Sequence, residues 1–226
     1  IIFGCTGTIG EIFPYEKISN NISNLINKIR YTQNKFIWMK AALAIMTTDT
    51  KPKLAMEECQ IGNEKVKIYG IAKGSGMIYP NMATMLAFLT CDVGVEKYLW
   101  DQMIKDACQL SFNAISVDGE TSTNDSFLAI NSGEKINHKY LPIIQEGINY
   151  VCQYLAKSIV RDGEGSNCLL EVFVTGTQNN YDALTISKSI INSSLVKTAI
   201  HGCDPNWGRI ISAAGSSGVD FNLSDV

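Results

Sequence analysis

Histidine is scarce in this 226-residue chain, and its two copies, His138 and His201, lie far apart in the sequence. Two isolated histidines do not supply a histidine-based zinc site. The count still permits a Ser-His-Asp triad, but neither histidine adjoins a recognisable nucleophile elbow. We therefore interpret both as surface or structural residues, and we expect neither a metal site nor a cofactor.

Paired cysteines, long apolar runs and a strong excess of one charge are also missing. The seven cysteines are scattered without a Cys-x-x-Cys pair, which is typical of reduced, packed thiols in a reducing compartment. No apolar run has the length of a transmembrane helix and no signal peptide is visible, although a chain that starts at Ile1 says little about targeting. The net charge of −3 argues against a general nucleic-acid or anionic-membrane surface.

The composition is that of a globular protein, with 46 % apolar and 18 % charged residues. A chain of this length buries a sizeable core in one large or two small domains, and it contains no internal repeat or low-complexity tract. Hydrophobic periodicity predicts the regular elements. Helices are expected at residues 18–29, 95–110, 141–160 and 181–196, and strands at 65–71, 86–93 and 169–175.

The most distinctive stretch runs from Lys73 to Phe88. Lys-Gly-Ser-Gly opens it with small residues that permit positive φ and close backbone approach. Pro80 then restricts the backbone, and an apolar run follows with a single hydroxyl, Thr84, in its middle. A β-branched threonine at the entry to a buried strand has an ordinary structural explanation. A nucleophile is the chemical alternative.

Four other segments also permit both a chemical and an ordinary interpretation. The Gly-rich turn at residues 4–10 could form an anion-binding nest of backbone N–H groups or a plain strand-to-helix turn. The Thr/Asp cluster at 47–50 suits capping, and the polar run at 118–125 suits a turn, since it lacks the spacing of a calcium loop. Gly163, after the long helix, suits a C-cap, which would leave Glu164 solvated.

The sequence Lys73-Gly-Ser-Gly-Met77, followed after three residues by Asn81-Met-Ala-Thr-Met-Leu86, resembles the self-cleavage segment of the ornithine acetyltransferases (glutamate N-acetyltransferases). The other segments match this family in order along nearly the whole chain, with Thr8 and Cys203 as mild departures. The resemblance implies that Ala83-Thr84 is the scissile bond and Thr84 the nucleophile. It implies an oxyanion hole at Thr6 and Gly7 and substrate binding at Thr50, Lys73, Thr84 and Glu164.

For the fold, the resemblance implies an α+β protein: a four-layer α/β/β/α sandwich with mixed sheets, of the self-cleaving N-terminal-nucleophile type. The main catalytic domain would span residues 1–165, and a smaller α/β domain would start at 166–226. The family also has segments before Ile1 and after Val226, and the latter supply an Asn and a Thr to the substrate site.

For the function, the resemblance implies acetyl transfer from N2-acetylornithine to glutamate through acetyl-Thr84 in arginine biosynthesis, with acetyl-CoA as a further donor in some members. The α and β chains of two cleaved precursors would assemble as α2β2, in bacterial cytoplasm or a mitochondrial matrix. Two alternatives stay open: a related self-cleaving aminopeptidase or amidase, and an uncleaved, non-catalytic copy. The α-amino group released on Thr84, with a pKa of about 7.7–8.0, could act as its base, which agrees with the scarcity of histidine.

Overall fold

The structure, a computed structural model, describes residues 4–29, 34–79 and 85–222. The strand-like run 1–3 and the predicted scissile pair, Ala83 and Thr84, lie outside the described residues.

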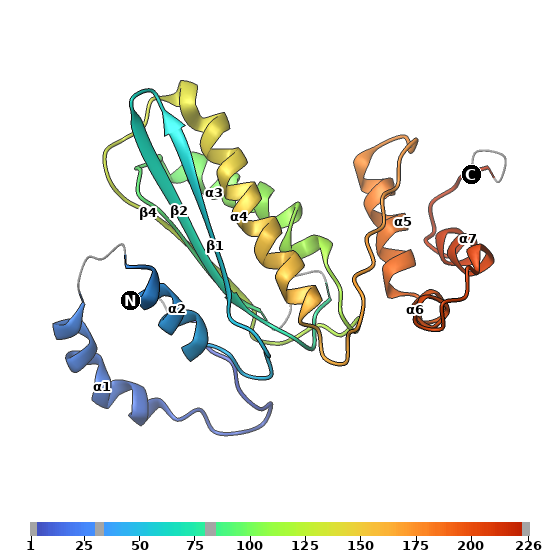
Figure 1. Cartoon of the computed structure of the whole chain (residues 1–226), viewed down its shortest axis with the longest axis horizontal. Coiled ribbons are helices and arrows are strands. Elements are labelled where there is room, and N and C mark those ends of the chain that lie inside the picture. Colours follow the sequence, from blue (N-terminus) through green and yellow to red (C-terminus); the bar gives the residue numbers. More distant parts are fainter. Residues whose placement is uncertain (1–3, 30–33, 80–84, 223–226) are drawn as a thin grey trace.

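Four strands form one mixed sheet in the order β1 (Lys53–Ile61), β2 (Glu64–Lys73), β3 (Leu86–Cys91) and β4 (Ser126–Asn131) (Figure 1). β1 and β2 form a hairpin through Gly62 and Asn63, and the positive φ of 59° at Gly62 suits the first position of a two-residue hairpin turn. β3 is antiparallel to β2, whereas β4 is parallel to β3. Lys73 is paired with Leu86, so both ends of the connection that carries the cleavage motif lie side by side.

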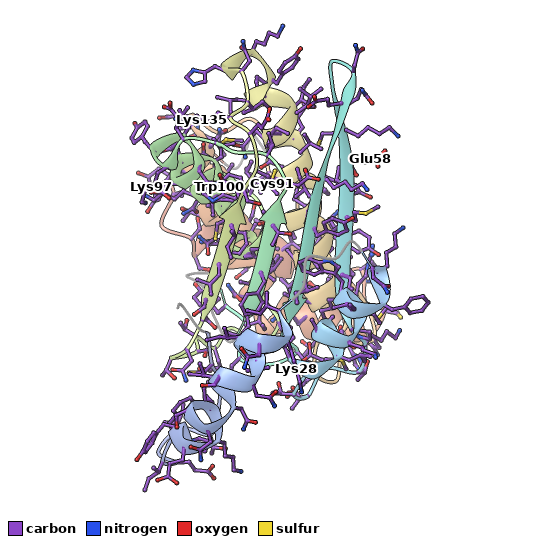
Figure 2. All side chains as sticks on the ribbon, turned by 90° about the vertical axis from the view of Figure 1, so that its left-hand side faces the viewer. Lys28, Glu58, Cys91, Lys97, Trp100 and Lys135 are labelled. Carbon is purple, nitrogen blue, oxygen red and sulfur yellow. The ribbon has the colours of Figure 1, made fainter. Side chains whose placement is uncertain are left out.

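One face of this sheet carries the main hydrophobic core. The helices α4 (Leu141–Arg161) and α3 (Lys97–Gln109) cover it, together with the short 3-10 helix η1 (Phe112–Ala114). Gly70 on β2 and Gly147 on α4 allow the long helix to approach closely, because a Cβ at Gly147 would lie 2.5 Å from the Cys59 Sγ. Trp100 and Cys91, labelled in Figure 2, belong to this core.

The opposite face is covered less completely. The helix α2 (Lys35–Ala44) lies there, and its Trp38 ring stacks on Tyr69 of β2 with 5.4 Å between the ring centroids. The helix α1 (Tyr15–Lys28) contains no buried residue and stands away from the sheet in Figure 1. Apolar surface is therefore left exposed on both of these helices within the described part of the chain.

A second, smaller core follows the long helix. It is formed by α5 (Asn180–Asn192), α6 (Ser194–His201) and α7 (Trp207–Gly215), around Ile186, Ile190 and Val196. Figure 1 shows these helices beside the C-terminal end of α4, and the 3-10 helix η2 (His138–Tyr140) precedes the other end of α4. Two separate cores agree with a boundary near residue 165, but the division into domains 1–165 and 166–226 stays a prediction.

The α+β class with a mixed sheet is confirmed, and the described residues build one sheet with helices against its faces. The strand expected at 169–175 is wrong. Leu170, Val172 and Val174 do place alternate side chains on the second core, but the segment has no strand partner among the described residues. The single helix expected at 181–196 is wrong in extent: it breaks at Ser193, whose side chain accepts the Val196 N–H and starts α6.

Candidate active site

The candidate site forms where the end of β2, the loop before β1 and the end of α4 meet. Backbone and side-chain hydrogen bonds join them. The Ser75 hydroxyl donates to the Asp162 carbonyl at 2.6 Å, and the Glu164 N–H donates to the Ser75 carbonyl at 2.9 Å. The Gly74 N–H donates to the Asp49 carboxylate at 2.7 Å. Three segments that the motif search identified separately are therefore one structure.

A buried ionic cluster holds this junction together. The Lys53 ammonium lies 2.6 Å from the carboxylates of both Asp49 and Asp162, and all three side chains are almost fully buried. Burial raises the pKa of both carboxyl groups. Hydrogen bonds from Lys53 and from nearby donors, such as the Gly74 N–H to Asp49 and Thr50 to Asp162, outweigh that effect and lower both pKa values. The two carboxylates therefore carry fixed charges that serve as scaffold.

Thr50 stands at the exposed rim of the cluster. Its N–H donates to the Asp162 carboxylate at 2.9 Å, and its hydroxyl donates to the other oxygen of the same carboxylate. Because the hydroxyl hydrogen is already used, the oxygen of Thr50 offers a substrate only acceptor lone pairs. Such an oxygen suits a substrate ammonium better than a substrate carboxylate.

Lys73 ends β2 and is 1 % exposed. Burial lowers the pKa of its ammonium, and the opposing charges of Asp49 and Asp125 raise it in part. The predicted substrate-binding lysine is therefore held in the sheet, where it is paired with Leu86. Leu86 follows Thr84 by two residues in the sequence. A buried cation at this place is suited to a carboxylate ligand.

Glu164 lies against the glycine-rich part of the motif. A Cβ at Gly76 would come within 2.8 Å of the Glu164 carboxyl carbon and within 2.9 Å of both of its oxygens. Gly76 therefore leaves the space that this carboxylate occupies. The structure brings Glu164, Lys73 and Thr50 to one region, and their role in substrate binding stays a prediction.

The predicted oxyanion turn reaches the same region through its first residue. A Cβ at Gly4 would lie 3.1 Å from the Leu86 side chain and 3.5 Å from Ser126, at the start of β3 and β4. Thr6 is half-buried and Gly7 is exposed. The assignment of these two residues to an oxyanion hole stays a prediction.

The polar run 118–125, which had no assigned role, holds both described ends of the cleavage loop. The Asp118 carboxylate accepts the N–H groups of Met77 at 2.6 Å and Ile78 at 3.0 Å. Met77 has a φ of 54°, a costly conformation for a residue with a side chain. At the other end, the Asp125 carboxylate accepts the Met85 N–H at 2.7 Å. In the sequence, the only indication of this role was the high density of hydrogen-bond acceptors in residues 118–125.

The described ranges 4–29, 34–79 and 85–222 contain no group of three or more His, Cys, Asp or Glu side chains placed to hold a metal ion. Both histidines are exposed, and burial raises the pKa of the Cys91 thiol to about 12, which keeps it from acting as a thiolate. Within the same ranges, no helix has the length and apolarity needed to cross a membrane.

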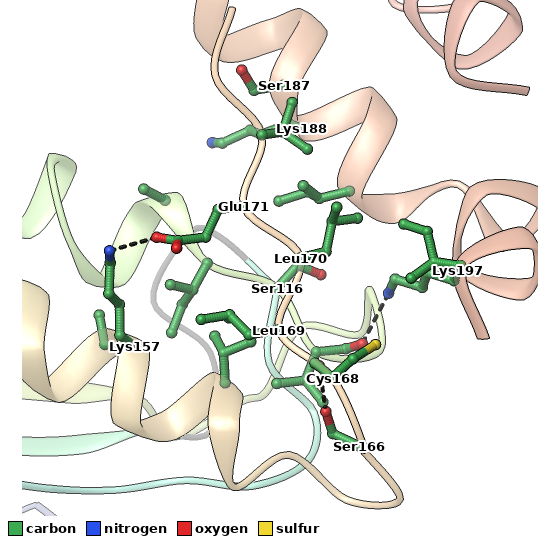
Figure 3. A pocket seen from close by; sticks show the side chains of 18 of the residues that line it. Ser116, Lys157, Ser166, Cys168, Leu169, Leu170, Glu171, Ser187, Lys188 and Lys197 are labelled. Carbon is green, nitrogen blue, oxygen red and sulfur yellow. Dashed lines mark hydrogen bonds and ion pairs between the residues drawn. The ribbon is translucent and has the colours of Figure 1, made fainter. Parts of the chain in front are cut away.

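A pocket of about 540 Å³ lies between the two cores (Figure 3). Residues 110–117, the end of α4, the extended segment 164–173 and the helices α5 and α6 line it. Lys157 pairs with Glu171 at 2.5 Å across one side, and the Lys197 ammonium donates to the Val117 carbonyl at 2.9 Å. Of the predicted site residues that the structure describes, Glu164 alone is in its lining, so the pocket adjoins the candidate site at that carboxylate.

Sequence and structure comparisons agree with the motif and the geometry. The chain belongs to the ArgJ family, whose model it matches over residues 1–226. It is 60 % identical over 223 residues to the arginine biosynthesis bifunctional protein ArgJ of Prochlorococcus marinus subsp. pastoris, covering 99 % of this chain and 54 % of that protein. It is 48 % identical to the arginine biosynthesis bifunctional protein ArgJ 1 of Nostoc sp., covering 100 % of this chain and 55 % of that protein.

A solved structure supports the fold. The crystal structure of the arginine biosynthesis bifunctional protein ArgJ from Bacillus halodurans matches with a TM-score of 0.54 and 38 % identity. The match covers 59 % of this chain and 65 % of that one. The chain spans about half the length of the curated relatives it matches.

Proposed function

We propose that the protein to which this chain belongs transfers acetyl from N2-acetylornithine to glutamate through an acetyl ester on Thr84. One observation carries this proposal: Thr50, Lys73 and Glu164, from three distant segments, lie in one region with the described residues on either side of Ala83-Thr84. The names of the relatives, which place them in arginine biosynthesis, support the same reaction.

Self-cleavage comes first. The Thr84 Oγ attacks the Ala83 carbonyl carbon, and the Ala83–Thr84 C–N bond breaks as an ester forms. Water then hydrolyses this ester, which releases the Ala83 carboxylate and leaves Thr84 with a free hydroxyl and a free α-amino group. That amine, with a reference pKa of about 7.7–8.0, has a useful neutral fraction near pH 7–8 and serves as the base.

Acetyl transfer follows in two steps. The Thr84 hydroxyl attacks the acetyl carbonyl of N-acetylornithine, the α-amine of ornithine leaves, and the Thr6 and Gly7 N–H groups stabilise the oxyanion. The α-amine of glutamate then attacks acetyl-Thr84 and regenerates the hydroxyl. In the first step Lys73 binds the carboxylate of N-acetylornithine, while Glu164 and the acceptor lone pairs of Thr50 bind its side-chain ammonium. In the second step Lys73 binds a carboxylate of glutamate, whose single amine must be neutral to attack the ester.

The assembly and setting are part of the proposal. Cleaved α and β chains pair as α2β2, and acetyl-CoA is a second acetyl donor, in agreement with the word "bifunctional" in the relatives' names. The bacterial relatives favour bacterial cytoplasm over a mitochondrial matrix.

Acetyl transfer is tested with the full-length, self-cleaved protein. N-acetylornithine labelled in the acetyl group is incubated with glutamate, and the products are separated. Labelled N-acetylglutamate and ornithine should form in equal amounts, with labelled acetate as a minor product. Labelled acetate as the main product would replace this proposal with the amidase alternative, and no turnover of a correctly cleaved protein would refute both.

A further inference from the structure

The start of β3 is fixed by two consecutive residues of the polar run. The Asp125 Oδ1 accepts the Met85 N–H at 2.7 Å, and the Ser126 N–H donates to the Met85 carbonyl at 3.0 Å. The Met85 nitrogen is covalently bonded to the carbonyl carbon of Thr84. A carboxylate is therefore hydrogen-bonded to the first amide after the proposed nucleophile, a short distance that covalent geometry sets.

The second oxygen of this carboxylate is unusual. The Asp125 Oδ2 is buried and, within the described part of the chain, has no hydrogen-bond partner. The Ser122 side chain lowers the pKa of this carboxyl group, but it makes no hydrogen bond to Oδ2. Buried carboxylate oxygens are nearly always paired, so an orphan oxygen needs a functional or structural reason.

Among the described residues, one cation acts on the Asp125 carboxylate. Lys73, at the end of the neighbouring β2, is the cation that interacts with it, and Asp49 faces the same ammonium. Burial raises the pKa of the Asp125 carboxyl to about 6, and the Met85 N–H and Lys73 oppose this rise. Its charge is therefore present at pH 7–8 and is lost at mildly acidic pH.

We propose that Asp125 is a positioning residue for the reaction at Thr84: one carboxylate oxygen fixes the amide that follows the nucleophile, and the other is the acceptor for a donor present during the reaction. This inference rests on the proposed function, because it takes Thr84 as the reacting residue. Asp118 serves a different purpose, since both of its oxygens are already occupied by the N–H groups of Met77 and Ile78.

The substitution Asp125→Asn separates the two roles. The amide oxygen of asparagine can still accept the Met85 N–H, but the charge and one acceptor oxygen are gone. Asp92→Asn is the matched control, because the Asp92 carboxylate also accepts a backbone N–H, that of Lys67 at 2.8 Å, and it follows the opposite end of β3. Neither substitution removes side-chain volume.

The experiment follows self-cleavage of the full-length precursor. Each precursor is made by cell-free translation with a radioactive label, shifted to buffers between pH 5 and 8.5, and sampled over time by gel electrophoresis and mass spectrometry. The α-amino group of Thr84 does not exist before cleavage, so it cannot contribute to this pH profile. Thermal unfolding of each variant, carrying Thr84→Ala to keep it intact, is measured alongside.

The wild type should cleave between residues 83 and 84 with a rate that rises through an inflection near pH 6. Asp125→Asn should cleave about ten- to a hundredfold more slowly, lose that inflection and unfold at an unchanged or higher temperature. Asp92→Asn should retain the wild-type rate and inflection.

Three results would overturn the inference. Asp125→Asn could cleave at the wild-type rate with the same inflection. It could cleave slowly while its unfolding temperature falls in proportion, which would make the role structural. A wild type that does not cleave at this bond would refute the proposed function itself, and the inference with it.

Discussion

Gly76 offers a direct test of how the site holds its substrate, because this glycine leaves space for the Glu164 carboxylate. In Gly76→Ala the new methyl group would lie 2.9 Å from each carboxyl oxygen, whereas ordinary contact begins at 3.4 Å. The carboxylate must therefore retreat by about 0.5 Å or rotate away. Glu164 is exposed, so the side chain can move without disturbing the core.

The magnitude follows from the interaction that Glu164 is proposed to make. A hydrogen bond to a charged group contributes about 1.5–3 kcal/mol, and a shift of this size removes part of it. A loss of about 1.4 kcal/mol corresponds to a tenfold weaker interaction. We expect Gly76→Ala to raise the KM for N-acetylornithine about tenfold, with kcat changed much less, because the contact with its side-chain ammonium is made in the ground state and in the transition state alike.

The assay measures steady-state acetyl transfer by the full-length, self-cleaved enzyme for wild type, Gly76→Ala, Glu164→Gln and the double variant. If Gly76 acts through Glu164, the alanine substitution should add little to the defect of Glu164→Gln. Unfolding temperatures should agree to within about 2 °C. Additive defects, or a KM unchanged in Gly76→Ala, would refute the placement of the substrate ammonium at Glu164.

Further predictions concern the scaffold. Lys53→Met leaves the Asp49 and Asp162 carboxylates buried without their cation, and it should lower the free energy of unfolding by about 3–5 kcal/mol in urea titrations. In the wild type, the pKa values of the Asp49 and Asp162 carboxyl groups are lower in the folded state than in the unfolded state, so the folded state binds fewer protons. The stability that these carboxylates contribute is therefore present above about pH 4 and is lost as the pH falls toward the folded pKa values. An acid titration without such a loss of stability would contradict the ionic cluster. Gly147→Ala should lower the free energy of unfolding by about 1–3 kcal/mol, because its Cβ would lie 2.5 Å from Cys59 and 2.7 Å from Ile68. An equally stable variant would mean that α4 does not pack so closely on the sheet. Backbone amides of residues 169–175 should exchange with deuterium within seconds in the 226-residue chain, because this segment has no strand partner among the described residues. Strong protection would show that the segment is paired.

The spacing of apolar residues along the sequence was sufficient to predict the elements that bury one face against the core. The spacing of apolar residues predicted α4, because Ile144, Ile148 and Leu155 must all face the sheet, and the pattern of β2 was equally clear. The strand β1 was not predicted, since Glu57 and Glu58 interrupt its apolar residues. The extended segment 169–175 has the alternation of a strand, but alternation cannot supply the partner that a strand needs.

The site divides in the same way. The family resemblance implied substrate-binding roles for Thr50, Lys73 and Glu164, and the structure brings the three residues to one region. The interactions that hold these residues in place are long-range, so no local sequence pattern reveals them. Lys53 and Asp162 are 109 residues apart in the sequence, and Met85 and Asp125 are 40 residues apart. An aspartate in a polar turn looks the same in the sequence whether it faces solvent or holds a catalytic segment.

The identity of the new N-terminus tests the central claim most directly. The full-length protein is purified after self-cleavage, and the mass and N-terminal sequence of each fragment are determined beside those of Thr84→Ala. We predict two fragments, one that ends at Ala83 and one that begins with Thr84, and a single intact chain for the variant. Cleavage of Thr84→Ala at the same bond, or a wild type that acetylates glutamate without being cut there, would contradict the assignment of Thr84 as the nucleophile.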